Sequence, residues 1–211
     1  WTTNVTTLSV EIGDPAFLID NSFHVVLGDG VNATAVLDGF TITKGYAKGS
    51  CTEEQCKGGG MLNRNTSSPT LTNITFTANG AESRGAGMAN MGGSNPTISH
   101  VLFQANQPSN GAGGMYNESS NPVLNDVTFN NNDVSGYGGG MWNNASSPTL
   151  TDVTFSGNDV TLSGGGMYNG SGSNPTLTRV TFSNNSAIYT GSSGGAGGAI
   201  FNTGSSPILQ D

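Results

Sequence analysis

The apolar and polar positions of this chain repeat every 26–27 residues. A glycine run precedes a methionine, an S-S-P-T-L phrase follows, and a V-T-F phrase ends three residues before an asparagine. One unit therefore reads G-G-G-M-x-N, S-S-P-T-L, V-T-F-x-x-N, and then a variable loop of Gly, Ser and Asp. The methionines are Met61, Met88, Met115, Met141 and Met167, and Ile200 takes the equivalent place after an insertion.

Each unit predicts short β-strands rather than helices. Gly, Asn, Ser, Thr and Pro fill every window that could carry a helical period. The remaining segments are rich in Thr, Val and Phe and are bounded by turn residues. Because strands this short are stable only when they stack on copies of themselves, the repeat predicts one coil of a parallel β-solenoid, with three short strands per coil.

The repeat register extends over the whole chain and predicts a single domain, residues 1–211. The phrase "AVLDGFTITKG" at 35–45 aligns as a degenerate earlier unit. We expect degenerate coils over 1–45, an inserted loop over 46–57 and regular coils over 58–211. The chain begins without a signal peptide and stops within a unit, so we expect it to be a piece of a longer protein.

Comparison of equivalent positions predicts which side chains face the interior. The methionine position is nearly constant in volume, as a packed core requires. The next position varies from alanine to tryptophan, so we expect it to face outward, and alternation then turns the following asparagines inward. Stacked at the strand spacing of about 4.8 Å, these amides can bond to one another. This asparagine ladder is Asn63, Asn90, Asn117, Asn143, Asn169 and Asn202.

The core is completed by a leucine, a valine and a phenylalanine in each unit, such as Leu150, Val153 and Phe155. The first two are three residues apart and the last two are two apart. Since side chains on one face of a strand recur every two residues, we expect a corner between the leucine and the valine.

The outward position predicts an interaction surface. Its larger side chains, called the aromatic row below, should stack one coil apart, and contiguous exposed apolar surface usually marks a binding site. The row could stack on sugar rings or pack against another solenoid, or a loop such as 188–196 could cover it. The row comprises Tyr116, Trp142, Tyr168 and Phe201.

Composition narrows the class of protein. The chain has six Lys and Arg against fourteen Asp and Glu, a net charge of −8, which argues against nucleic-acid binding. No apolar run is long enough to span a bilayer, so we expect no membrane insertion by this segment. Glycine is abundant and apolar content is only 34%, yet the strict period argues against disorder.

The chain resembles the repeats of chlamydial polymorphic outer-membrane proteins. Those repeats carry G-G-A-I and F-x-x-N signatures; "GGAI" stands at Gly197–Ile200, and F-x-x-N occurs in all five full units. The phrase "SSPTLTDVTFSGN" is also similar to surface β-helix proteins of environmental bacteria. The resemblance implies an all-β, right-handed parallel β-helix that is secreted and displayed at a bacterial surface. The general preference for right-handed crossovers agrees with that hand.

Acidic side chains also recur in equivalent positions, Asp126 with Asp152 and Asp133 with Asp159. Such clusters can act as an acid and a base, or hold calcium, in β-helix polysaccharide enzymes. The first position continues with Gly, Asn, His and Arg, as a solvated surface position does. His24 and His100 have no serine or cysteine partner at a repeated offset. We therefore expect no enzyme, no metal and no cofactor, apart from adventitious calcium at these aspartate pairs.

Two further features have structural explanations. Cys51 and Cys56 lack the further ligands of a zinc site, so we expect a disulfide that closes the inserted loop and indicates an oxidising compartment. A threonine position, interrupted by Leu102, is typical of outward strand residues and, as a weaker alternative, of ice-binding surfaces. Its threonines are Thr41, Thr75, Thr128, Thr154 and Thr181.

Together these features predict a non-catalytic extracellular rod, either a cell-surface adhesin or a filament subunit. Neither end of the solenoid has the polar cap that such folds need, so end-to-end self-association is expected, with lateral association as another route. Cell-surface glycans are the other expected partner. A polysaccharide-binding or polysaccharide-cleaving β-helix protein is the alternative.

Overall fold

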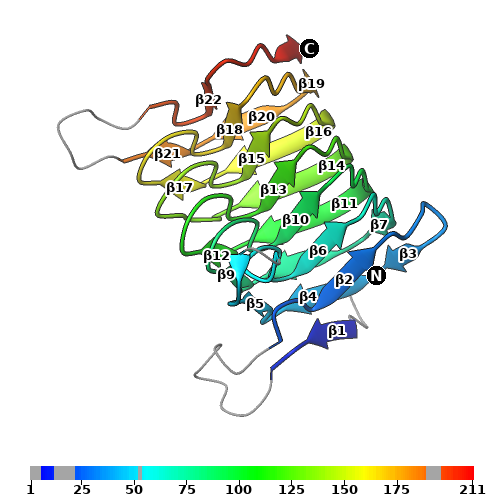
Figure 1. The fold of residues 1–211 in the computed structure, drawn as a ribbon. Helices are drawn as coiled ribbons and strands as arrows, with labels where there is room; N and C mark the ends of the chain where they lie inside the picture. Colours follow the sequence, from blue (N-terminus) through cyan, green and yellow to red (C-terminus); the bar gives the residue numbers. More distant parts are fainter. Residues whose placement is uncertain (1–5, 12–21, 52–53, 189–195) are drawn as a thin grey trace.

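The computed structural model describes residues 6–11, 22–51, 54–188 and 196–211. Within these residues the chain winds into a stack of parallel coils, from the N-terminal strands at one end to the C-terminal strands at the other (Figure 1). Every strand pairing is parallel, as the repeat predicts, because each coil returns to the same place one turn later.

The G-G-G-M-x-N phrases form a seven-stranded sheet. Its register pairs methionine with methionine and asparagine with asparagine in successive coils. In sheet order its strands are β2 (Val26–Asp29), β6 (Met61–Arg64), β10 (Met88–Met91), β13 (Met115–Glu118), β15 (Met141–Asn144), β18 (Met167–Gly170) and β22 (Ile200–Asn202).

The leucine and V-T-F phrases form an eleven-stranded sheet. In its middle coils the two phrases join into one bent strand of eight residues. Its main path is β1 (Thr6–Ser9), β4 (Phe40–Thr43), β8 (Thr75–Thr77), β11 (Thr97–Gln104), β14 (Val123–Asn130), β16 (Thr149–Ser156), β19 (Thr176–Thr178) and β23 (Ile208–Gln210); beside it lie β3 (Val36–Asp38), β7 (Thr70–Thr72) and β20 (Thr181–Ser183).

Each coil was expected to have strands at the methionine, leucine and V-T-F phrases. Further strands of two residues follow the V-T-F phrase, where the sequence pattern indicated only a loop. They form a three-stranded and a two-stranded sheet. The strands are β5 (Tyr46–Ala47), β9 (Gly80–Ala81), β12 (Gln107–Pro108), β17 (Asp159–Val160) and β21 (Ser186–Ala187).

The expected corner between Leu150 and Val153 lies at Asp152, whose φ is 54°. Equivalent residues of the other coils share this left-handed conformation, which Asn, Asp and Gly tolerate best. The bend also explains why this position accepts such varied side chains: the requirement at the corner is a left-handed backbone conformation, not a side chain that fits a packed interior. The equivalent residues are Gly39, Asn73, His100, Asp126 and Arg179.

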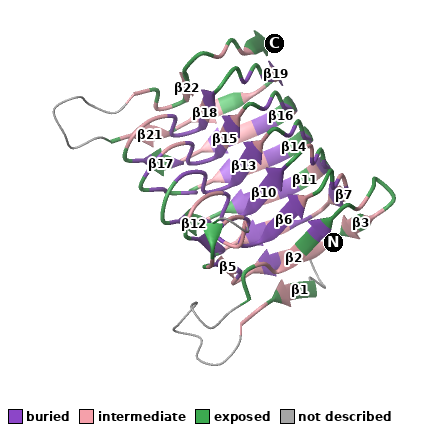
Figure 2. Ribbon diagram, in the orientation of Figure 1, coloured by how far each residue is buried: buried purple, intermediate pink, exposed green. Residues whose placement is uncertain are grey.

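The interior consists of the columns that the repeat places inside. Met141, Leu150, Val153 and Phe155 are fully buried, and the middle coils carry most of the buried residues (Figure 2). Successive phenylalanine rings stack nearly parallel, with centroids 4.8 Å apart, from Phe76 to Phe182. This spacing is the strand spacing, so the ring stack follows directly from the coil register.

Candidate functional site

The outer face of the seven-stranded sheet carries the aromatic row. Strand pairing places Tyr116 beside Trp142, Trp142 beside Tyr168, and Tyr168 beside Phe201. Neighbouring ring centroids are 5.3–5.6 Å apart. Tyr137, from the loop before β15, joins the row with its ring 5.5 Å from Trp142 and 4.9 Å from Tyr168. Five aromatic rings from four coils therefore lie together on this face.

The prediction of an open row is wrong at its N-terminal end. Tyr116 is fully buried, and the smaller residues Leu62 and Ala89 of the same column are buried as well. They form a second apolar cluster with Met91 and Ala112, outside the main core, against which Trp142 packs. The variation in size at this position correctly predicted that these side chains lie outside the coil. A further layer of side chains nevertheless covers them.

Two cations from preceding loops form that layer. The Arg84 guanidinium carbon lies 5.2 Å from the Tyr116 ring centroid and 4.3 Å from that of Trp142. Arg84 Nη1 donates to Tyr116 Oη at 3.3 Å. Lys57 Nζ lies 5.9 Å from the Tyr116 ring and forms an ion pair with Glu118 at 3.3 Å. Burial under these groups raises the pKa of the Tyr116 phenol, although the Arg84 charge opposes the shift.

The rest of the row is partly exposed. Trp142, Tyr168, Phe201 and Tyr137 are all half-buried. Partial burial, with a smaller contribution from Tyr137, raises the pKa of Tyr168. The loop that we considered as a cover falls largely at 189–195, outside the described residues. The open part of the site is therefore the segment from Trp142 to Phe201.

Gly111 lies against Trp142, where the covered and the partly exposed parts of the aromatic row meet. Gly111 has a φ of +60°, and a Cβ placed on it would lie 2.3 Å from the Trp142 ring. The indole therefore leans into a space that only glycine leaves open, which brings it against Arg84.

The asparagine ladder lies inside the coils. Asn63, Asn90, Asn117, Asn143 and Asn169 are fully buried, and each Nδ2 donates to Oδ1 of the next asparagine at 2.8–2.9 Å, ending on Asn202. Asn202 itself is exposed, in the last described coil. The ladder is structural, because its amide groups bond to one another and not toward solvent.

Two more polar ladders, which the repeat pattern did not predict, lie inside the coils. The F-x-x-N asparagines Asn79, Asn106, Asn132 and Asn158 are also buried. Each donates to the carbonyl oxygen of a core residue in the preceding coil, as Asn132 does to Phe103, and to the next asparagine. The first serine of S-S-P or its equivalent accepts from the backbone of the coil before, as Ser120 does from Ser94. Both ladders could have been found from the sequence, because the same polar residue, the asparagine or the serine, recurs at one position of every unit.

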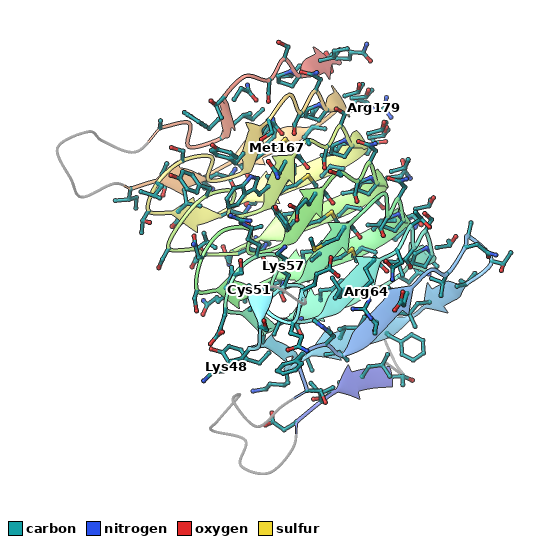
Figure 3. All side chains as sticks on the ribbon, viewed as in Figure 1. Lys48, Cys51, Lys57, Arg64, Met167 and Arg179 are labelled. Atoms are coloured by element: carbon teal, nitrogen blue, oxygen red, sulfur yellow. A yellow bond between two sulfur atoms is a disulfide. The ribbon has the colours of Figure 1, made fainter. Side chains whose placement is uncertain are left out.

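The cysteines are joined in a disulfide, Cys51–Cys56, with Cα atoms 5.0 Å apart. It closes the inserted loop immediately before Lys57, and Figure 3 shows both in the N-terminal half of the stack. Residues 52–53 of this loop lie outside the described residues. The disulfide therefore holds the segment from which Lys57 reaches over Tyr116.

The repeated aspartates do not form one site. Asp126 lies 3.6 Å from His100, and Asp152 bonds to Arg179 through both carboxylate oxygens at 2.7 and 2.8 Å. Arg179 lowers the pKa of the Asp152 carboxyl. Asp159 accepts from Ser186, and its backbone N–H donates to Asp133. Among the described residues, no three His, Cys, Asp or Glu side chains gather where they could hold a metal ion.

Family comparisons agree with this architecture. The model of the right-handed beta helix region matches residues 9–160, which is more than half of the chain. The chain belongs to the right-handed β-helix family. A second match, to the Chlamydia polymorphic membrane protein repeat, covers residues 179–203 of this β-helix. Searches of curated proteins and of solved structures gave no significant match.

The threonine column of this β-helix lies on the outer face of the eleven-stranded sheet. Strand pairing aligns Thr41, Thr75, Leu102, Thr128, Thr154 and Thr181 in one row. The row runs beside the bend that carries His100, Asp126, Asp152 and Arg179. The charged residues Asp126, Asp152 and Arg179 thus border the threonines of the later coils, whereas Gly39 and Asn73 take the same place in the earlier ones.

His24 is half-buried in the β-helix and contacts a backbone carbonyl rather than a reactive side chain. Its Nδ1 lies 2.9 Å from the carbonyl oxygen of Gly58, and burial lowers its pKa. No helix in the described part of the chain is long and apolar enough to cross a membrane.

Proposed function

We propose that this β-helix is a non-catalytic, adhesin-like rod of the bacterial surface or extracellular matrix that binds glycans through its aromatic row. The observation that carries the proposal is the half-buried segment of Trp142, Tyr168 and Phe201, joined by Tyr137. Aromatic faces stack on the C–H faces of sugar rings, and a row spanning several coils suits a linear polymer. The match to the Chlamydia polymorphic membrane protein repeat supports a surface location.

A binding experiment on glycan arrays tests this proposal. Trp142→Ala should weaken glycan binding at least about tenfold, since buried aromatic anchors dominate contact surfaces. Tyr168→Ala provides a second variant, because it does not contact Arg84. Phe23→Ala is the matched control: Phe23 is an exposed aromatic residue away from the row. Unchanged binding by both row variants would contradict the proposal.

The absence of catalysis is part of the proposal. Asp152 bonds to Arg179 through both carboxylate oxygens, and Asp126 lies beside His100 rather than bonding to Asp152, so the two carboxylates do not act on one another. Incubation with acidic and neutral polysaccharides should release no reducing ends. Cleavage that is lost in Asp152→Ala would overturn this part.

Filament formation is a second candidate, favoured by the register of the two end faces. Strand β1 pairs with β4 with Leu8 opposite Ile42, which places Leu8 in the phenylalanine column. At the other end, β20 is paired along one edge only among the described strands, beside a cavity of about 370 Å³ lined by Leu177, Val180, Phe182 and Leu209. Strand β1 of a second copy could therefore pair with β20 by β-augmentation.

Electron microscopy and light scattering test the filament. Leu8→Asp should abolish assembly, whereas Thr7→Asp, on the outer face of the same strand, should leave it intact. Monomers at all concentrations would rule the filament out without affecting the glycan proposal.

A further inference from the structure

The aromatic row ends at a cation that has no acidic partner. Four of the six basic side chains form ion pairs with carboxylates: Lys44 with Glu11, Lys57 with Glu118, Arg64 with Asp29 and Arg179 with Asp152. Within the described residues, no carboxylate lies within ion-pair distance of Arg84. In a chain with a net charge of −8, a basic group held away from every described carboxylate is notable.

Arg84 is held instead by aromatic rings. Its guanidinium lies over Trp142 at 4.3 Å and close to Tyr116, to which Nη1 donates. Stacking on a ring restricts the side chain without forming an ion pair. The group is therefore fixed before any ligand arrives, which lowers the entropic cost of binding.

The remaining nitrogens of Arg84 show where an anion could bind. Nε is buried and has no hydrogen-bond partner among the described residues. Nη2 likewise makes no hydrogen bond there, but it is not among the buried atoms. The accessible donor is therefore Nη2, which belongs to the guanidinium that lies over Trp142, where the open part of the row begins.

We propose that Arg84 binds the carboxylate of a uronic acid in a linear polysaccharide that lies along the aromatic row. This inference rests on the proposed glycan binding and adds the ligand class. The exposed parts of Trp142, Tyr168 and Phe201 would contact successive sugars, and Nη2 would donate a charge-assisted hydrogen bond to the carboxylate. Lys57 is not proposed to bind the carboxylate, because it already forms an ion pair with Glu118.

A matched pair of polymers tests the carboxylate directly. The probes are hyaluronan and the same hyaluronan with its carboxylates reduced to primary alcohols. The wild type should bind hyaluronan about tenfold more tightly than the reduced polymer, as expected for a hydrogen bond to a charged group. Arg84→Met should bring this ratio to about one while retaining binding to the reduced polymer.

Arg64→Met is the matched control, since it removes the same charge at an arginine already paired with Asp29. It should retain the tenfold preference, which separates a local contact from general electrostatics. A wild type without preference, or an Arg84→Met variant that keeps it, would overturn the inference.

These outcomes separate the inference from the function on which it rests. If both polymers bind equally and Trp142→Ala weakens both, the aromatic row binds glycan and only the role of Arg84 is wrong. If neither polymer binds, the inference falls; the glycan arrays then decide the proposed function separately.

Discussion

At the residue scale, asparagine is the side chain on which the interior most depends. Alternation from the methionine position correctly predicted that Asn143 and its equivalents face inward. Alternation along the V-T-F strand does not predict the inward F-x-x-N asparagines, because the residue before each one has a positive φ, for example 52° at Ala105 before Asn106. That conformation turns the chain and interrupts the two-residue alternation, which no letter pattern in a single unit shows.

Replacing one member of the asparagine ladder should destabilise the whole coil stack. Asn143→Leu keeps the branched heavy-atom skeleton but leaves a donor of Asn117 and an acceptor of Asn169 buried without partners. We expect the free energy of unfolding to fall by about 3 kcal/mol in urea titrations. Asn125→Ala, at an exposed position of β14, is the control and should change it by less than about 0.5 kcal/mol. Equal effects would show that the ladder is not a specific stabilising feature.

His24 should make stability depend on pH. Burial lowers the pKa of its folded form below the usual 6.5, so the unfolded chain takes up the proton first. The stability that neutral His24 gives the folded chain is fully present above the pKa of the unfolded form, and it is lost as the pH falls through the lower pKa of the folded form. Between about pH 7.5 and about pH 5 the wild type should therefore lose more stability than His24→Gln, measured by urea titration at each pH. Parallel pH profiles would contradict this assignment.

At the element scale, the strands and their corner follow from the repeat. The leucine and V-T-F phrases predicted two strands with a turn between them. In the middle coils they form one strand, whose register pairs residues on both sides of the left-handed residue while leaving that residue itself unpaired. The two-residue third strands could not be predicted from period-two patterning, because Asp159–Val160 and its equivalents are too short to show a period.

The glycine runs should be required for packing rather than for flexibility. A Cβ on Gly140 would lie 2.6 Å from the Phe155 ring and 2.7 Å from the backbone oxygen of Gly166. Gly140→Ala should therefore reduce the unfolding free energy by about 3 kcal/mol. Gly172 has a positive φ but nothing within 4 Å of such a Cβ, so Gly172→Ala should cost only about 1 kcal/mol. Thermal unfolding of both variants measures the difference, and the reverse order would refute the packing explanation.

At the scale of the whole molecule, the repeat predicts the stack but not its outer layer. The coil register, the parallel pairing and the core columns all follow from the spacing of equivalent residues. The cover over Tyr116 does not, because Lys57 and Arg84 belong to the variable loops, where length and composition change from coil to coil. The repeat therefore predicts the aromatic row less well than any other part. Tyr116 at one end of the row is covered by Lys57 and Arg84, and the other end, toward Phe201, is partly exposed.

The central claim is that the aromatic row contacts glycan, and fluorescence of Trp142 tests it most directly. The chain has two tryptophans, so Trp1→Phe leaves Trp142 as the only indole. Titration with hyaluronan and its carboxyl-reduced form should change the Trp142 emission saturably, with the larger affinity for hyaluronan. Emission that stays constant with both polymers, while either one binds by an independent assay, would place the contact elsewhere and contradict the account.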